Sequence, residues 1–195
     1  MGWEEKVRRV VPYIPGEQPK QKGIIKLNTN ECPYPPSPLV KRKAAEFQTD
    51  ELRLYPDPDA SLLVKSLADY YGVKEDQIFV GVGSDDVLAM CFLTFFNSDR
   101  SVLFPDITYS FYDVWAELFQ IPYRCPALDE DFRLKKEDYL SENGGIVIPN
   151  PNAPTGLYEE LDTIEEIVAS NPDSVVIIDE AYVDFGGRSA LELVD

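Results

Sequence analysis

The residues best suited to chemistry stand at the end of one apolar run. Residues 175–178 are all apolar, and Asp179 and Glu180 follow them directly. A short continuous apolar run is typical of a strand buried on both faces of a parallel sheet. We therefore expect Asp179 at the carboxyl end of its strand, the edge where open α/β sheets bind ligands. A buried strand that ends in two carboxylates requires a partner for their charge.

Three roles are open for Asp179 from these residues alone. The acidic pair could serve Mg²⁺ and water in a nucleotide hydrolase, but the Gly-x-x-x-x-Gly-Lys-Ser/Thr loop of such enzymes is absent from the sequence. Asp179 could instead lie under a pyridinium nitrogen, as in pyridoxal phosphate sites. The third interpretation is a plain helix-capping aspartate after an ordinary strand.

A glycine turn at residues 81–84 indicates an anion site. It lies between residues 78–80, predicted as a short buried strand, and the start of a helix. Glycines allow close approach of the backbone, and the free N–H groups at a helix start attract an anion. A dinucleotide fingerprint needs a third glycine where Asp86 stands, so a lone phosphate is favoured, with Ser84 adding a hydroxyl. A tight strand-to-helix turn without a ligand is the alternative.

Two more loops follow predicted strands at the same sheet edge. Tyr109 comes after the strand at 102–104 and could stack on a flat cofactor ring or serve as a core aromatic. The loop at 150–156 follows the strand at 146–148 and is rich in turn-forming residues, which predicts a rigid loop. Asn152 can offer a hydrogen bond to a ring substituent there, whereas a plain strand-to-helix loop is the other interpretation.

The elements that position these loops follow from apolar periodicity. Helices are predicted over 38–47, 61–71, from about 84, over 111–118 and over 161–168, and strands at 78–80, 102–104, 121–125, 146–148 and 175–178. Alternating strands and helices of this length predict an α/β fold with a doubly wound, mainly parallel sheet. Ser61 is expected to cap its helix and Gly72 to end it. The proline-rich residues 1–37 are predicted as an irregular arm draped over another surface.

Composition excludes several classes of function. The 195 residues carry 18 basic and 35 acidic side chains, a net charge of −17, which argues against nucleic acid and anionic membranes as partners. Histidine is absent, which excludes His-based metal sites and triads. The three cysteines are widely spaced and form no zinc pattern, which suits a reducing compartment. Because the sequence has no apolar signal core and no run of membrane-spanning length, we expect a soluble cytoplasmic protein.

Several short motifs occur together in a fixed order. They are Pro12-Tyr-Ile-Pro-Gly16, Leu27-Asn-Thr-Asn-Glu31, Tyr55-Pro-Asp57, Gly83-Ser-Asp85, Thr108-Tyr109, Pro151-Asn-Ala-Pro-Thr-Gly156 and Asp179-Glu-Ala-Tyr182. With them the chain resembles the class I and II aminotransferases of pyridoxal-phosphate fold type I over nearly all of its length. The first two motifs resemble the branch of that family that acts on histidinol phosphate.

The resemblance implies pyridoxal 5′-phosphate as cofactor and assigns it a set of residues. Ser84 and Asp85 are expected to hold the phosphate, chiefly through backbone N–H groups. Tyr109 is expected to stack on one face of the ring and Ala181 to pack on the other. Metal ions have no part in this site.

Further roles implied by the resemblance concern catalysis and the substrate. Asp179 pairs with the ring nitrogen and keeps it protonated, which makes the ring an electron sink. Asn152 and Tyr182 are expected near the ring hydroxyl. Tyr55 is expected to reach the phosphate of the neighbouring subunit in a homodimer. Asn28 and Tyr34 are expected beside the substrate.

The chain departs from the family pattern at three points. Ala153 stands where the family usually has asparagine, and Cys32 stands where it prefers asparagine too. The Schiff-base lysine is expected roughly thirty residues after Asp179, beyond Asp195. None of the ten lysines follows Lys136, so the chain alone is expected to lack catalytic activity.

These observations predict the N-terminal half of an enzyme. Residues 1–50 are expected to form the arm and the start of the small domain, and 51–195 the first part of the cofactor-binding large domain. The intact enzyme is expected to move an amino group between histidinol phosphate and 2-oxoglutarate in histidine biosynthesis. Alternatives are an aromatic aminotransferase, a phospho-amino-acid decarboxylase or a lysine-less binding module. In the family's sheet order, the strands at 78–80 and 175–178 both lie beside strands encoded later.

Overall fold

The computed structural model describes residues 2–21 and 23–194. They form two compact units. The first, here called the sheet unit, joins the residues up to Tyr13 to the chain from Gly81 onward, and the second, the helical unit, is Ile14–Val80. The predicted assignment of residues 1–50 and 51–195 to two domains of the family stays a prediction.

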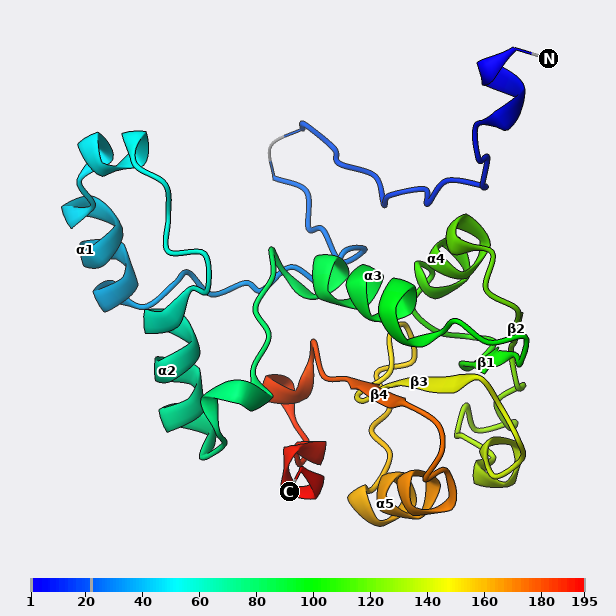
Figure 1. The fold of residues 1–195 in the computed structure, drawn as a ribbon. Helices are drawn as coiled ribbons and strands as arrows, with labels where there is room; N and C mark the ends of the chain where they lie inside the picture. Colours follow the sequence, from blue (N-terminus) through cyan, green and yellow to red (C-terminus); the bar gives the residue numbers. More distant parts are fainter. Residues whose placement is uncertain (1, 22, 195) are drawn as a thin grey trace. The chain divides into compact units, whose positions relative to one another are not determined.

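The sheet unit is built on four parallel strands in the order β2-β1-β3-β4 (Figure 1). The strands are β1 (Val102–Leu103), β2 (Tyr123–Arg124), β3 (Gly145–Pro149) and β4 (Val176–Asp179). Helix α4 (Tyr112–Phe119) connects β1 to β2, and α5 (Leu161–Ser170) connects β3 to β4. Parallel neighbours require such crossovers. The predicted parallel α/β fold is confirmed.

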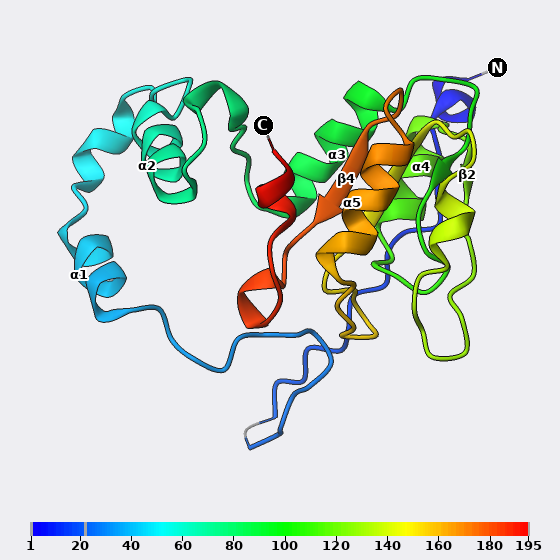
Figure 2. The same cartoon turned by 90° about the horizontal axis from the view of Figure 1, so that it is seen from below.

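Helices cover both faces of this sheet. Helix α3 (Ser84–Phe95) and α4 lie on one face and α5 on the other, as Figures 1 and 2 show from two directions. Along β3 the side chains alternate between the two layers: Val147 packs with the α3 and α4 residues, whereas Ile146 and Ile148 pack with α5. All of β3 is buried, which is why its sequence is apolar without interruption.

The buried side of α4 agrees with the sequence pattern only in part. The pattern predicts a stripe of Phe111, Val114, Trp115 and Leu118, whereas the buried residues are Tyr112, Trp115 and Ala116 and the other three are partly exposed. The arm also packs on this helix. The ring centroid of Tyr13 lies 4.5 Å from that of Phe111, so the arm partly covers the Phe111 side chain at the start of α4.

The first part of the arm contacts α4, which confirms the predicted draping up to Tyr13, whereas residues 14–37 belong to the helical unit. Besides the Tyr13 contact, Arg8 Nη1 donates to the carbonyl of Leu118 at 3.0 Å. Trp3 does not share in this packing and is 74% exposed. No helix in the described ranges is long and apolar enough to cross a membrane.

The helical unit contains α1 (Pro38–Glu46) and α2 (Ser61–Tyr71). Gly72 ends α2 in the left-handed conformation with φ 71°, as predicted. The prediction that Ser61 caps α2 is wrong, because Ser61 is already helical. The capping acceptor is Asp57, whose Oδ2 receives the Ser61 N–H at 2.8 Å.

The prediction of a strand at residues 78–80 is also wrong. No strand in the part of the chain that the structure describes pairs with this segment, and Phe79 is 68% exposed. A strand exists only through its ladder of hydrogen bonds to a neighbour. The remaining regular segments are short 3₁₀ turns at Trp3–Lys6, Thr49–Arg53, Glu75–Gln77, Lys136–Tyr139, Val183–Phe185 and Ala190–Leu193.

Candidate functional site

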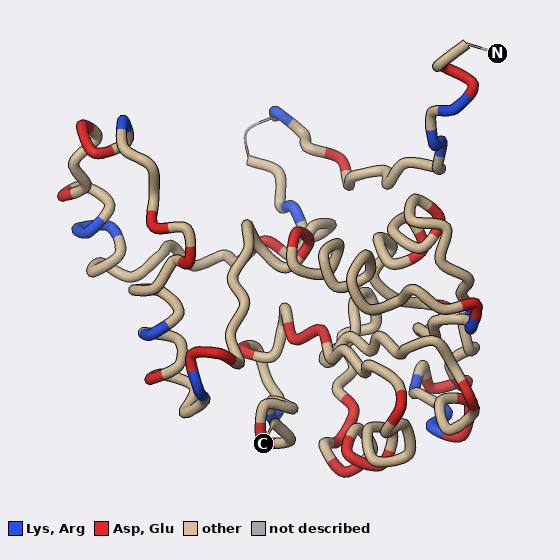
Figure 3. The backbone as a smooth tube through the Cα atoms, in the orientation of Figure 1, with Lys and Arg blue, Asp and Glu red and all other residues tan. Residues whose placement is uncertain are grey.

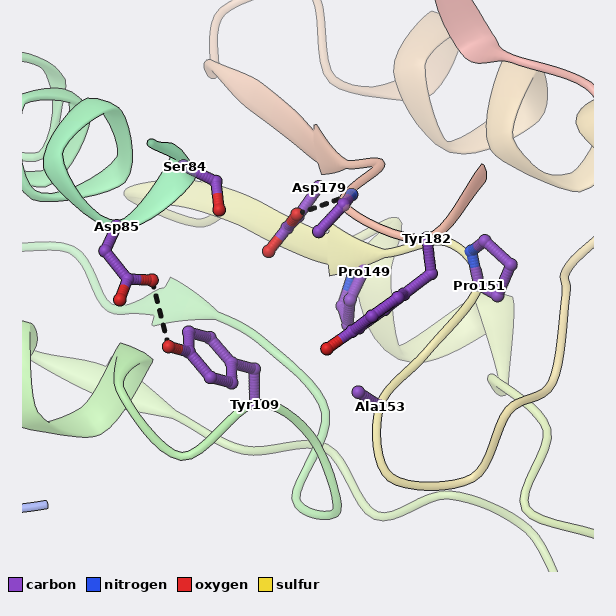
Figure 4. A pocket seen from close by; sticks show the side chains of 9 residues that line it. Ser84, Asp85, Tyr109, Pro149, Pro151, Ala153, Asp179 and Tyr182 are labelled. Atoms are coloured by element: carbon purple, nitrogen blue, oxygen red, sulfur yellow. Dashed lines mark hydrogen bonds between the residues drawn. The ribbon is translucent and has the colours of Figure 1, made fainter. Parts of the chain in front are cut away.

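A pocket opens at the carboxyl ends of β3 and β4 in the sheet unit (Figure 4). It is lined by Ser84, Asp85, Tyr109, Pro149, Pro151, Ala153, Asp179, Ala181 and Tyr182. Six of these nine residues are among those that the sequence marked for a cofactor. The cavity measures about 100 Å³, smaller than the roughly 300–1,000 Å³ of complete ligand sites. The described residues therefore form only part of the wall of a ligand site of that size.

Asp179 ends β4 and points into this pocket (Figure 4). Its Oδ2 accepts a hydrogen bond of 2.7 Å from Tyr112 Oη, and its Oδ1 accepts one of 3.1 Å from the Ala181 N–H. These donors are the partners that a carboxylate at the end of an apolar strand requires. No α-helix begins in the residues directly after β4, which leaves the helix-capping interpretation without a helix to cap. Within the described ranges, no group of three acidic or cysteine side chains is arranged to hold a metal ion.

The glycine turn delivers the start of α3 to the pocket. Gly83 has φ 87° and ψ 172°, a conformation nearly restricted to glycine, and Ser84 and Asp85 follow as the first two helical residues. The first N–H groups of an α-helix have no acceptor within the helix. Here the start of α3 faces the same cavity as Asp179.

Asp86 explains why this turn is not a dinucleotide fingerprint. Its Oδ2 accepts the Val82 N–H at 3.1 Å and so closes the turn from within. A Cβ added to Gly81 would lie 2.8 Å from that same oxygen and 2.8 Å from Val87 Cγ2. Gly81 therefore allows the turn to pack closely against α3. The Asp86 carboxylate occupies the position where the third glycine of a dinucleotide fingerprint would stand.

Tyr109 stands across the pocket from the end of β4. Its Oη donates to Asp85 Oδ1 at 2.9 Å, which links the loop after β1 to the start of α3 (Figure 4). Burial, and then the hydrogen bond with Asp85, raise the pKa of Tyr109 well above its ordinary value, so its hydroxyl stays a donor. The ring is partly exposed and lines the cavity, so it is more than a core aromatic.

Asn152 does not line the pocket, whereas its neighbour Ala153 does. The Asn152 amide nitrogen donates to the Ile107 carbonyl at 2.9 Å and to Thr155 Oγ1 at 3.1 Å. Its amide oxygen accepts from Thr108 Oγ1 at 3.2 Å. Asn152 thus fastens the loop after β3 to the loop after β1. The predicted contact with a ring hydroxyl stays a prediction, and this arrangement offers it no free donor.

Three predicted residues belong to the helical unit. Tyr55 is fully exposed there, and Tyr34 is 78% exposed. Asn28 donates through Nδ2 to the Glu17 carbonyl at 3.1 Å, which holds two segments of that unit together. Their expected contacts with a neighbouring subunit and with substrate stay predictions.

Sequence reasoning missed Tyr112, which binds Asp179 without lining the cavity. The signal was present: Tyr112 follows Tyr109 by three residues, at the start of a predicted helix. Side chains three residues apart at a helix start lie on the same side. Pro149, Pro151 and Ala153 were missed as lining residues because nothing in their type points to chemistry.

Known proteins that are similar to this chain belong to the family that its motifs resemble. The model of the family "Aminotransferase class I and II" matches residues 22–194. Histidinol-phosphate aminotransferase 1 of Hydrogenovibrio crunogenus is 54% identical over 192 residues, 98% of this chain and 54% of the relative. Histidinol-phosphate aminotransferase of Lactococcus lactis subsp. cremoris strain SK11 is 53% identical over 195 residues, 100% of this chain and 55% of the relative. The chain thus spans about half the length of the curated relatives it matches.

A solved structure shares the fold. The histidinol-phosphate aminotransferase of Sinorhizobium meliloti, determined in complex with pyridoxal-5′-phosphate, superimposes with a TM-score of 0.72 at 20% identity. The match covers 80% of this chain and 43% of that one. The two chains therefore share the fold of the parallel sheet and its covering helices.

Proposed function

Because the chain belongs to the aminotransferase class I and II family, we propose that the whole protein is a pyridoxal-phosphate-dependent aminotransferase acting on histidinol phosphate and 2-oxoglutarate. Relatives that are 53–54% identical carry the name histidinol-phosphate aminotransferase. The observation that carries the proposal is the position of Asp179. Its carboxylate lies at the tip of β4, in one cavity with a helix start and an aromatic ring.

The residues present fit the cofactor at its phosphate end. The chain carries a net charge of −17, and acidic segments recur throughout it (Figure 3), so a phosphate must be held by local donors. The start of α3 supplies them: the N–H groups of Ser84 and Asp85 and the Ser84 hydroxyl bind the phosphate. The carboxylate of Asp85 is turned toward Tyr109, with which it shares a hydrogen bond of 2.9 Å.

The residues also fit the ring. Tyr109 would cover one face of the bound ring, Ala181 would pack on the other, and Tyr182 would lie beside the ring hydroxyl. When bound, pyridoxal phosphate supplies a protonated ring that stabilises negative charge at the substrate Cα. Asp179 would accept the hydrogen bond of the protonated ring nitrogen. Its carboxylate is already oriented by two hydrogen bonds, one at each oxygen.

The helical unit contributes through a second subunit in this proposal. Tyr55 is fully exposed in its own unit, so its hydroxyl is available to a phosphate held by the neighbouring copy of a homodimer. Asn28 and Tyr34 lie beside the substrate. In this proposal the rest of the protein supplies the Schiff-base lysine and the substrate-binding groups that the described residues lack.

The test is transamination by the full-length protein with Asp179→Asn as the probe. We expect conversion of histidinol phosphate to depend on 2-oxoglutarate and to exceed that of aromatic amino acids. Asp179→Asn should lower kcat by several orders of magnitude while cofactor stays bound, because the ring nitrogen loses its anionic partner. Asp162→Asn, at an exposed position of α5, is the matched control and should leave kcat unchanged.

Two results would contradict the proposal. Near-normal turnover in Asp179→Asn would remove the assigned role. A wild-type protein that binds pyridoxal phosphate but transaminates none of these substrates would favour a non-catalytic binding module instead.

A further inference from the structure

The carboxylate of Asp179 is held from behind by a residue outside the pocket wall. Tyr112 is the first residue of α4, has no exposed surface, and donates from Oη to Asp179 Oδ2 at 2.7 Å. The two residues are 67 positions apart in the sequence. The other oxygen, Oδ1, accepts from the Ala181 N–H, so each carboxylate oxygen has its own donor.

The ring of Tyr112 is fixed by aromatic neighbours. Phe92 of α3 stacks on it at a centroid distance of 6.2 Å, and Phe104 meets it edge to face at 5.7 Å. Tyr109 meets it at 5.7 Å with an interplanar angle of 84°. With rings on several sides, Tyr112 cannot turn its hydroxyl away from Asp179 without displacing the core. The direction of the hydrogen bond is therefore set by packing.

The hydroxyl also keeps its proton. Burial, followed by the charge of Asp179, raises the pKa of Tyr112 well above its ordinary value. Tyr112 therefore acts as a permanent donor to the Asp179 carboxylate.

We infer that Tyr112 is a positioning residue for the reaction, which holds the Asp179 carboxylate directed at the ring nitrogen of the cofactor. The inference rests on the proposed function. If the Tyr112 hydroxyl is removed, the Asp179 carboxylate loses one of its two donors and the contact that directs it. It would then support the protonated ring nitrogen less well, and the bound cofactor would be a weaker electron sink.

The chain offers a matched control in Tyr139. It is also enclosed, with 1% of its surface exposed, and its hydroxyl has no hydrogen-bond partner among the described residues. Tyr139→Phe removes the same atom from the core without removing a bond to Asp179. Any effect of Tyr112→Phe that Tyr139→Phe lacks therefore belongs to the bond.

The experiment uses the full-length protein loaded with pyridoxal phosphate labelled with ¹⁵N in the ring. In Tyr112→Phe we expect the ring-nitrogen resonance to move from its wild-type position toward the position seen in Asp179→Asn, with no movement in Tyr139→Phe. Turnover should fall by about tenfold to a hundredfold, with KM changed less than about threefold. Added to Asp179→Asn, Tyr112→Phe should lower kcat by less than about twofold, because it acts through that carboxylate.

A second variant keeps the test decisive if Tyr112→Phe folds poorly. Tyr112→3-fluorotyrosine retains the shape of the ring and makes the hydroxyl a stronger donor, so the resonance should move away from the position seen in Asp179→Asn. An unmoved resonance in both variants, or an undiminished effect in the Asp179→Asn background, overturns the inference while the proposed function stands. A wild-type protein without cofactor binding or transamination overturns both.

Discussion

Tyrosines three residues apart bind the carboxylates on two sides of the pocket. Tyr109 donates to Asp85 at the start of α3, and Tyr112 donates to Asp179 at the end of β4. Their rings meet edge to face at 5.7 Å, so the two hydrogen bonds are anchored to one aromatic pair. One aromatic pair thereby holds both the proposed phosphate-binding residue and the proposed partner of the ring nitrogen.

Tyr109→Phe tests the first of these bonds. The variant keeps the ring but loses the bond to Asp85, and we expect the free energy of unfolding to fall by about 1 kcal/mol near pH 7. The pKa of Tyr109 is raised in the folded state, so this contribution is complete below about pH 10, where unfolded tyrosine begins to ionise. It is lost as the pH rises through the higher folded-state value.

Denaturant titrations of wild type and variant between pH 6 and 11 measure this difference. The gap in stability should stay constant up to about pH 9 and shrink above about pH 10. Tyr139→Phe serves again as the control, since its hydroxyl bonds none of the described residues. A gap that is absent at pH 7 would show that the Asp85 bond contributes nothing.

Most regular elements could be predicted because their signals are local. The apolar runs at β1, β3 and β4 and the periodic stripes of α4 and α5 identify the parallel sheet and its crossovers. The prediction failed where a segment depends on a distant neighbour. Residues 78–80 have the composition of a strand, but composition cannot supply the hydrogen-bonded partner that makes one.

The site could be predicted in its outline but not in its internal bonds. Asp179, Tyr109 and Ser84 follow strands or begin a helix, so the edge of the sheet brings them together. The spacing from Tyr109 indicated the side on which Tyr112 lies, but its bond to Asp179 and the bonds of Asn152 could not be predicted in this way. They depend on which rotamer the packed core allows, and the sequence carries only residue types.

Substitution of Gly83 tests whether the strand-to-helix turn shapes the pocket. Its φ of 87° with ψ of 172° strains any side chain, whereas Gly72 has φ 71° and ψ 29° at the end of α2. We expect Gly83→Ala to lower the free energy of unfolding of the full-length protein by about 1–3 kcal/mol and Gly72→Ala by about 1 kcal/mol. Only Gly83→Ala should also weaken binding of pyridoxal phosphate, because it reorients the first N–H groups of α3.

Titration of the two variants with cofactor, alongside chemical denaturation, separates the effects. Equal cofactor affinity in both variants would mean that the turn has a purely structural role. Gly81→Ala is a further comparison, since its added Cβ would meet the Asp86 carboxylate and Val87.

Both units expose apolar surface that a stable monomer would cover. In the helical unit Leu62, Tyr70 and Phe79 are 82%, 79% and 68% exposed. In the sheet unit β4 is the last strand of the order, and Val175 beside it is 39% exposed. An open strand edge and large apolar patches favour association with other chains. The net charge of −17 slows aggregation but cannot pair a strand.

We therefore expect the 195-residue chain by itself to self-associate or unfold in part. Sedimentation should detect oligomers that grow with concentration, and hydrogen exchange should be faster in β4 than in β3, which has neighbours on both sides. Val175→Lys, which places a charge beside the open edge, should reduce association. A compact monomer with protected amides in β4 and at 78–80 would contradict this expectation.

The place of Asp179 on the outermost strand couples two events that are usually considered separately. A ligand that binds this carboxylate orders the end of β4, and a strand that pairs with the free edge of β4 orders the same residues. Each event therefore strengthens the other, and by thermodynamic reciprocity the two effects are equal in size. Cofactor affinity measured on variants of this edge is thus also a measure of how completely the sheet has assembled.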